Sequence, residues 1–361
     1  MTPTDIIKTR LLNQQISARN FKTPEEIVAW QLGFQAQDFT SSKWAIGMRL
    51  SNTTEAEVEK ALLERKIIRT WPMRGTIHII AAADVHWMFD LLKPHILRIH
   101  ASVFREQNLN EAILLKSNDV LQQLLENKKE LTREELSLGL KQKGIEADKV
   151  RLSCILTHAG LSKLIHFGTK RDAEFTYSLY HSLPLQSTSF EIDEAAAHMA
   201  YRFFNSHGPA TLEDFTWWSG LSRSKAKIAI ELAKVNLQEI KDKDQTYWMS
   251  TTISPLQDHS TTFLLPSFDE YLMGYRDRSF FLDSKNQKDV ILKNGLFKSS
   301  IIIDGKIIGT WKRINQKEAI QIEATPFIPL NERQKSTIHK EAERYARFLE
   351  KPLLDVKYIH I

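Results

Sequence analysis

Apolar and polar positions along the chain switch repeatedly between helical and β periods, and a threonine precedes three of the helical segments. In each case the threonine lies three residues before an acid: Thr23–Glu26, Thr132–Glu135 and Thr211–Asp214. This spacing is typical of a capping box at a helix start, with Asp214 as a shorter variant. Pro24 occupies a first helical position, where its missing N–H costs nothing. We therefore expect helices to begin at these three points.

The same order of elements follows each of these starts. A second helical segment comes next, and then two β runs around a turn, which indicate a hairpin. The expected second helices cover residues 55–65, 148–158 and 224–234, and the expected strand pairs cover 67–71 with 76–80, 164–167 with 174–178, and 237–240 with 246–249. Helices followed by a short hairpin describe a winged helix, whose second helix would enter a nucleic-acid groove. The alternative is a short array of helical hairpins with no role in DNA binding.

The pattern changes at about residue 261. Two β runs flank Asp304-Gly305, a strong hairpin signal, and further strands are expected at 262–268 and 319–324. A charged amphipathic helix is expected at 331–349. The fold class predicted is α+β: three tandem winged-helix units at 1–95, 96–185 and 186–255, followed by a β-barrel-like C-terminal domain at 256–361.

Charge, cysteine content and the lack of long apolar runs exclude some classes of protein but do not indicate a single function. The chain has 361 residues and a formal net charge of +5, a mild basic excess that is compatible with a polyanionic partner. Cys154 is the single cysteine, so neither a disulfide framework nor a thiolate zinc site is expected. The N-terminus lacks signal-peptide features and no apolar run approaches membrane-spanning length, so we expect a cytoplasmic protein.

Two uncharged amides, Gln35 and Gln37, flank Ala36 near the end of the first capped helix. Residues two apart point away from each other on a helix, so both can serve one site only if the backbone leaves the helix there. Glutamine donates and accepts hydrogen bonds without titrating, which suits it to holding a water molecule or reading a base edge. The neighbouring Asp38 is a candidate general base, or alternatively a cap for the next segment.

Cations and aromatic residues elsewhere are candidates for contacts with nucleic acid. Arg74, Thr76 and His78 alternate along one expected strand and so would face one way, with Arg69 and Trp71 on the preceding strand. The polar and aromatic stretch from Phe268 to Arg278 either contacts substrate or forms an internal salt-bridge network. This stretch adds Tyr275, Arg276 and Arg278 as candidates for DNA contact. The turn of the second hairpin adds Lys170 and Arg171, and the third unit adds Arg223, Lys225 and Lys227. His86, His95 and His100 lie at spacings that do not suit a metal site.

Three stretches in this order resemble the AlkZ-like winged-helix DNA glycosylases, which include azinomycin-resistance and crosslink-unhooking enzymes: Gln35-Ala36-Gln37, Arg74 to His78, and Phe268 to Arg278. The resemblance implies tandem winged helices and a C-terminal β-barrel around a basic DNA channel. It also implies that Gln35 and Gln37 form the catalytic pair. A related branch has an acid at the second position, and Gln37 argues against that branch.

The resemblance implies a monofunctional DNA glycosylase that removes N7-alkylated purines, in some members including interstrand crosslinks. Such an enzyme needs no metal or cofactor, and we expect a monomer that binds alkylated double-stranded DNA near the nucleoid. Alkylation at N7 makes the purine cationic, so the base departs neutral and needs little acid assistance. Two amide oxygens can then orient a water molecule and stabilise the developing sugar cation.

The rival hypothesis is a non-catalytic DNA-binding protein, such as a regulator or a damage-binding module. Glutamine can pair with adenine, so in this reading the two amides would read base edges. The modest net charge of +5 and the lack of an obvious dimerisation segment weigh against a repressor that reads palindromes.

Overall fold

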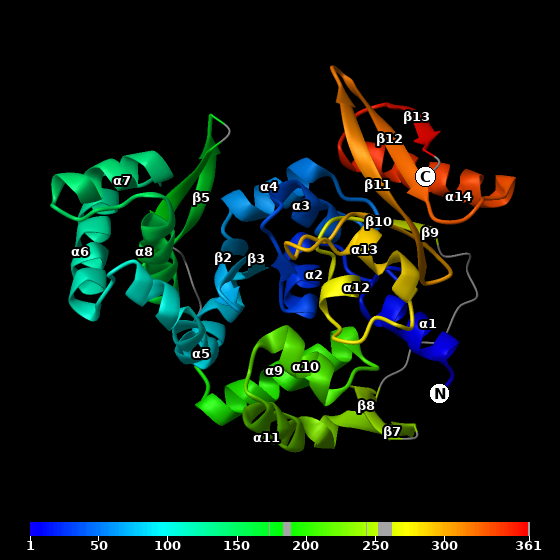
Figure 1. Ribbon diagram of the computed structural model, residues 1–361, viewed down its shortest axis with the longest axis horizontal. Helices are drawn as coiled ribbons and strands as arrows, with labels where there is room; N and C mark the ends of the chain where they lie inside the picture. The colour runs from blue at the N-terminus through cyan, green and yellow to red at the C-terminus, as the bar shows by residue number, and fades with distance from the viewer. Residues whose placement is uncertain (173, 183–188, 243, 252–261, 360–361) are drawn as a thin grey trace.

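The computed structural model describes residues 1–172, 174–182, 189–242, 244–251 and 262–359 (Figure 1). The domain boundaries expected at 185/186 and 255/256 lie outside these residues. Short 3-10 helices occupy Ala82–Asp84, Tyr180–Ser182, Lys234–Asn236 and Ser284–Asn286.

The first part of the chain has four helices and a three-stranded sheet. The helices are α1 (Pro3–Asn13), α2 (Pro24–Gln31), α3 (Phe39–Gly47) and α4 (Glu55–Leu63), and the hairpin is β2 (Ile67–Met73) with β3 (Thr76–Ala81). A two-residue strand, β1 (Phe34–Gln35), pairs with β3, so the sheet order is β1-β3-β2. The capping box at Thr23 forms in both directions, as its sequence predicts.

The second part repeats this arrangement after a long helix, α5 (Val85–Glu106). Helices α6 (Glu111–Lys128), α7 (Arg133–Gln142) and α8 (Lys149–Leu161) precede the hairpin β5 (Ile165–Arg171) and β6 (Glu174–Leu179). Strand β4 (Leu131–Thr132) pairs with β6, which gives the order β4-β6-β5. Each of these two sheets thus adds a two-residue strand to the second strand of its hairpin.

The third part has α9 (Ile192–His207), α10 (Leu212–Ser219) and α11 (Arg223–Ala233), followed by the two-stranded hairpin β7 (Leu237–Asp242) and β8 (Gln245–Ser250). The capping boxes at Thr132 and Thr211 are both present. The helices and hairpins that the pattern predicts are therefore confirmed. Their interpretation as three winged helices stays a prediction.

The C-terminal part is a five-stranded sheet with the order β13-β12-β11-β10-β9. Its elements are β9 (Thr262–Leu265), α12 (Glu270–Met273), α13 (Gln287–Val290), β10 (Ser300–Ile303), β11 (Lys306–Gln316), β12 (Ala319–Pro326), α14 (Glu332–Phe348) and β13 (Leu353–Tyr358). Among the described strands β9 and β13 form open edges, so this sheet does not close into the expected barrel. The parallel pairing of β13 with β12 was not foreseen.

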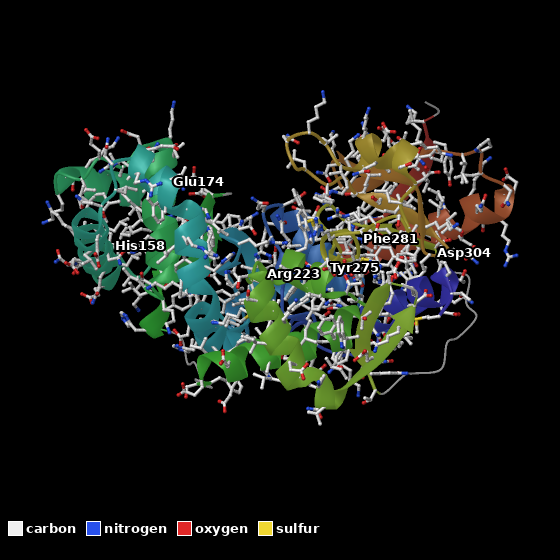
Figure 2. The ribbon with its side chains drawn as sticks, turned by 60° about the horizontal axis from the view of Figure 1, so that its bottom comes forward. His158, Glu174, Arg223, Tyr275, Phe281 and Asp304 are labelled. Atoms are coloured by element: carbon white, nitrogen blue, oxygen red, sulfur yellow. The ribbon has the colours of Figure 1, made fainter. Side chains whose placement is uncertain are left out.

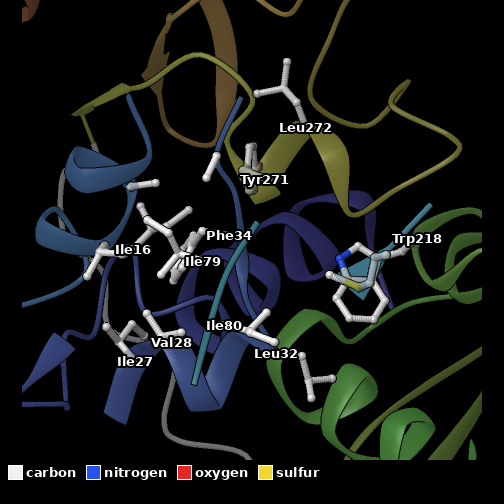
Figure 3. Close-up of a cluster of buried hydrophobic side chains, with 14 of the residues drawn as sticks. Ile16, Ile27, Val28, Leu32, Phe34, Ile79, Ile80, Trp218, Tyr271 and Leu272 are labelled. Carbon is white, nitrogen blue, oxygen red and sulfur yellow. The ribbon is translucent and has the colours of Figure 1, made fainter. Parts of the chain in front are cut away.

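Within the described segments the buried apolar side chains form two clusters. The larger one joins the first, third and C-terminal parts, and Figure 3 shows Phe34, Ile79 and Tyr271 among its members. The smaller one belongs to the second part, with Trp71 of β2 added to it. In Figure 1 the second part accordingly stands to one side, while the first part lies between it and the C-terminal sheet. Across the described segments, no helix is both long enough and apolar enough to cross a membrane.

Candidate active site

The backbone leaves its helix just before the two glutamines. Helix α2 ends at Gln31, and Leu32 adopts a left-handed conformation with φ 61°. Gly33 has φ +119°, and a Cβ there would lie 2.8 Å from Cγ2 of Ile80. Glycine is therefore required at this position, both for its conformation and for the close approach of β3. The chain then enters β1 at Phe34.

On this extended backbone the side chains of Gln35 and Gln37 meet, because residues two apart on a strand face the same side. Nε2 of Gln35 donates to Oε1 of Gln37. The backbone N–H of Gln37 donates to Oε1 of Gln35 at 3.2 Å. Gln35 is only 4% exposed, whereas Gln37 is exposed. The pair therefore presents one buried and one accessible amide.

Neighbouring strands hold the backbone of the pair. The N–H of Ala36 donates to the carbonyl of Ile77 at 2.7 Å. The carbonyl of Ala36 accepts from Nε and Nη2 of Arg69 at 3.3 and 3.0 Å. The Arg69 guanidinium lies over the rings of Phe167 and Phe175, 4.1 and 3.9 Å from their centroids. Burial lowers the pKa of Arg69 to about 10, so it stays cationic at neutral pH.

A cavity of about 470 Å³ opens beside Gln37, between the first hairpin and the second part of the chain. Its volume is in the range of small-molecule sites. Aromatic rings, hydroxyls and two arginines line it: Arg69, Trp71, Thr76, Arg133, Ser153, Thr157, Phe167, Phe175 and Tyr177, with the carboxylate of Glu174. A polar ligand with a flat apolar ring would suit this lining.

A polar cluster is buried behind Gln35. Oε1 of Glu270 accepts the backbone N–H of Gln35 at 3.4 Å, and Oε2 accepts Nε1–H of Trp218 at 2.9 Å. Nε2 of His207 lies 3.7 Å from Oε2 of Glu270. His78, paired with Gln35 across the strands, is fully buried, and its Nε2 has no hydrogen-bond partner among the residues that the structure describes.

The charges in this cluster follow from burial and hydrogen bonding. Burial opposes ionisation of Glu270, but the contacts with His207 and Trp218 and the nearby His78 keep its pKa below the usual range. Burial, together with the cation of Arg74, lowers the pKa of His78 to about 4. Burial also lowers the pKa of His207. His78 is therefore neutral at pH 7, while the low pKa of Glu270 depends on its contact with His207.

Three residues expected at the DNA surface lie inside the molecule. Trp71 is 6% exposed and its ring centroid lies 4.5 Å from that of Phe167. Nδ1–H of His78 donates to the carbonyl of Thr76 at 2.9 Å. The hydroxyl of Tyr275 donates to the carbonyl of His207 at 2.7 Å, and Figure 2 shows this residue in the interior near Phe281. Packing against distant elements, which local sequence does not reveal, accounts for these positions.

The expected common face of Arg74, Thr76 and His78 is not formed. Arg74 lies in the turn with φ 52° and donates to the carbonyl of Trp217 at 3.1 Å, while Thr76 lines the cavity. Arg278 is turned inward, because its Nε donates to the carbonyl of Leu272 at 2.8 Å.

Most of the other predicted cations are at the surface. The exposed ones are Lys170, Arg171, Arg223, Lys227 and Arg276, and Lys225 is half-buried. Arg171 forms an ion pair with Glu135, and Arg223 forms one with Glu213. The ammonium of Lys170 lies 4.8 Å from the ring centroid of Phe39. Lys170 thus lies near the amide pair, since Phe175, which lines the cavity beside Gln37, is also 5.0 Å from its ammonium.

Sequence reasoning missed the histidine and tryptophan of the buried cluster. His207 and Trp218 come from α9 and α10, far from the glutamines in sequence. The acid Glu270 lies in the Phe268 to Arg278 stretch, which was singled out without identifying its contact with Gln35. Of the residues in the buried cluster that sequence analysis did not connect with Gln35, only Glu270 therefore lay in a stretch that had been singled out.

The site combines a hydrogen-bonded amide pair, a cavity and the buried guanidinium of Arg69 on helix–hairpin units. The family model described as DNA glycosylase AlkZ-like matches residues 28–348. The chain therefore belongs to the AlkZ-like DNA glycosylases, as the three sequence stretches predicted, and its class is that of a DNA-repair glycosylase.

Two comparisons extend over almost the whole chain. An interstrand DNA cross-link repair glycosylase from Streptomyces sahachiroi is 22% identical over 94% of this chain and 94% of its own length. The solved structure of the Streptomyces sahachiroi DNA glycosylase AlkZ matches with a TM-score of 0.84 at 21% identity, covering 99% of this chain and 100% of that one. The mixed fold described above is therefore the AlkZ fold.

Proposed function

We propose that this protein hydrolyses the N-glycosidic bond of cationic N7-alkylated purines in double-stranded DNA. The observation that carries the proposal is the hydrogen-bonded pair of Gln35 and Gln37 beside a cavity, in a chain of the AlkZ-like family. We extend the proposal to interstrand crosslinks, because the similar Streptomyces protein is named for their repair.

The chemistry needs no strong acid, since the alkylated base leaves as a neutral molecule. What it needs is a water molecule next to C1′ and stabilisation of the sugar cation. The two side-chain amides supply oxygen dipoles in a fixed arrangement, and the exposed Gln37 would hold the water. Among the described residues that line the cavity there is no lysine to form a Schiff base, which supports a monofunctional enzyme.

We propose that the surface cations bind DNA phosphates and that the protein acts as a monomer. Lys170, Arg171, Arg223, Lys225, Lys227 and Arg276 are the candidates, and phosphate contacts of this kind position the duplex without reading sequence. The division into winged-helix units 1–95, 96–185 and 186–255, with a C-terminal domain 256–361, belongs to the same proposal.

The test is excision of 7-methylguanine from a duplex by Gln35→Ala and Gln37→Ala under single-turnover conditions. Each variant should lose about 10²-fold in rate, comparable to removing one preorganised hydrogen-bonding group from an active site, and should keep its DNA affinity. Gln122→Ala, an exposed glutamine on α6, is the matched control and should excise at the parental rate.

Parental rates in both variants would show that the amide pair is not catalytic. Absence of abasic sites with every protein, on alkylated and undamaged duplexes alike, would instead favour the non-catalytic DNA-binding reading. Salt-sensitive DNA binding does not separate the two, because both readings predict it.

A further inference from the structure

We propose that Arg133 binds a backbone phosphate of DNA in the cavity beside Gln37, with the guanidinium of Arg69 as a second positive charge behind it. The inference rests on the proposed function, because it takes damaged DNA as the ligand. It adds a residue from the second part of the chain to the site, and it assigns the cavity a defined occupant.

The guanidinium of Arg133 is held in place at the wall of the cavity. Arg133 is the first residue of α7, is half-buried, and lines the same cavity as Gln37. Its Nη2 donates to the carbonyl of Lys149 at 2.9 Å and to the hydroxyl of Ser153 at 2.7 Å. Both acceptors are uncharged, so they orient the guanidinium without neutralising it. The donors on Nη1 and Nε take no part in these two contacts.

Arg69 brings a second guanidinium to the same cavity. It is 6% exposed between the rings of Phe167 and Phe175, and its Nη1 is buried with no hydrogen-bond partner in the described part of the chain. Burial raises the pKa of Tyr177, whereas the cations of Arg133 and Arg69 both lower it. The hydroxyl of Tyr177, another residue of the cavity wall, therefore lies close to both guanidiniums.

Neither of these two cations is neutralised by a carboxylate. Arg171, on the nearby hairpin, shows the ordinary arrangement, an ion pair with Glu135. Across the described segments no carboxylate lies within 4 Å of the Arg69 or Arg133 guanidinium, and Glu174, the one acid in the cavity lining, is exposed, so water screens its charge. Arginine is charged at neutral pH in any surroundings. Since two cations close together in a poorly screened cavity repel each other, a bound anion stabilises this arrangement.

The remaining polar groups of the cavity suit a phosphate. Ser153 and Thr157 lie four residues apart on one face of α8, and Thr76 lines the cavity from the first hairpin. Guanidiniums and hydroxyls are donors that proteins use on phosphate oxygens. The two guanidiniums would repel a cationic alkylpurine. The cavity therefore suits the phosphodiester, whose sugar carries the C1′ that the amide pair must reach, and the aromatic rings can pack against that sugar.

The decisive experiment neutralises single phosphates in a duplex that carries a tetrahydrofuran abasic site. A methylphosphonate replaces each phosphate around the tetrahydrofuran in turn, and Kd is measured at fixed salt. At one of the two phosphates that flank the tetrahydrofuran, the parent should bind about tenfold more weakly, as expected for lost charge-assisted hydrogen bonds. Arg133→Gln should bind the unmodified duplex about tenfold more weakly, yet bind the methylphosphonate duplex within threefold of the parent, because both changes remove one interaction.

Two further variants separate phosphate binding from support of the fold. Arg133→Lys keeps a charge that binds phosphate, so it should keep the methylphosphonate penalty and the salt dependence of Kd. In Arg133→Gln the slope of log Kd against log salt should fall by about one. If Arg133 only held α8 in place, Lys would be as defective as Gln, and no single phosphate would matter. Arg347→Gln, an exposed arginine on α14 at the far side of the molecule in Figure 1, is the control and should behave as the parent.

The same methylphosphonate penalty in the parent and in folded Arg133→Gln overturns the inference. If Arg133→Gln does not fold, a folded Arg133→Lys without the penalty overturns it equally, as does a parent that is insensitive to both flanking phosphates. None of these measurements needs catalysis. A parent that shows the penalty but excises no 7-methylguanine therefore refutes the proposed glycosylase activity and leaves the phosphate site standing.

Discussion

The carboxylate of Asp38 adjoins the amide pair in sequence, yet both of its oxygens are occupied by Ser41. Oδ1 accepts the backbone N–H of Ser41 at 3.0 Å, and Oδ2 accepts its hydroxyl at 2.8 Å. Asp38 is thus the N-cap of α3, the cap that was one of its two expected roles. As a general base it would have to give up contacts that hold a helix start.

Substitution of Asp38 distinguishes a cap from a base. Asn is as good a cap as Asp, so Asp38→Asn should keep the stability of the parent and excise 7-methylguanine within threefold of its rate. Asp38→Ala should lose about 1 kcal/mol of unfolding free energy, measured in urea. A tenfold or greater loss of rate in a fully stable Asp38→Asn would assign the carboxylate a chemical role.

Residue-level prediction succeeded where the signal was local. The Gln35–Gln37 pair could be singled out from spacing and residue type, but the way the amides meet depends on Leu32 and Gly33 bringing the chain out of its helix. Burial depends instead on partners distant in sequence. For that reason nothing local indicated that Trp71 would be in the core of the second part.

At the scale of elements, capping boxes and turn residues predicted where helices and hairpins lie, because each is determined by a few neighbouring residues. The two-residue strands β1 and β4 and the parallel partner β13 escaped prediction, because their pairing joins separate stretches of chain. The sequence did not predict that the C-terminal sheet stays open, because its strand order also depends on pairing between separate stretches of chain.

Contact between the first hairpin and the second part depends on a glycine in α8. A Cβ at Gly160 would lie 2.4 Å from Cε3 of Trp71, on β2. Gly160→Ala should therefore lower the free energy of unfolding by about 1–2 kcal/mol, since overpacking outweighs the better helix propensity of Ala. Urea denaturation of the parent and the variant measures this change in the free energy of unfolding. Val150→Ala, 53% exposed on the same helix, should change stability by less than about 0.5 kcal/mol. A Gly160→Ala protein as stable as the parent would contradict this packing.

At the scale of the whole molecule, one core joins the first, third and C-terminal parts, so the amide pair rests on elements from across the chain. Buried ion pairs link the same parts: Arg49 to Asp269, and Arg10 to Asp214 at 3.6 Å. The second part, with its own core, supplies the other wall of the cavity. The shape of the cavity beside Gln37 therefore depends on the contact between the second part and the core formed by the first, third and C-terminal parts.

Buried histidines make the stability of the molecule depend on pH. Burial lowers the pKa of His78 and of His166 to about 4, from 6.5 in the unfolded chain. Between these values the unfolded state binds more protons, so stability is full above about pH 6.5 and is lost as the pH falls toward 4. When the pH falls from 7.5 to 5, protonation of each imidazole in the unfolded state should lower the free energy of unfolding by about 2 kcal/mol, measured in urea. His78→Gln should reduce this dependence, while His339→Gln, exposed on α14, should leave it unchanged. Equal stability of the parent at both pH values would show that the two imidazoles are not held neutral by the fold.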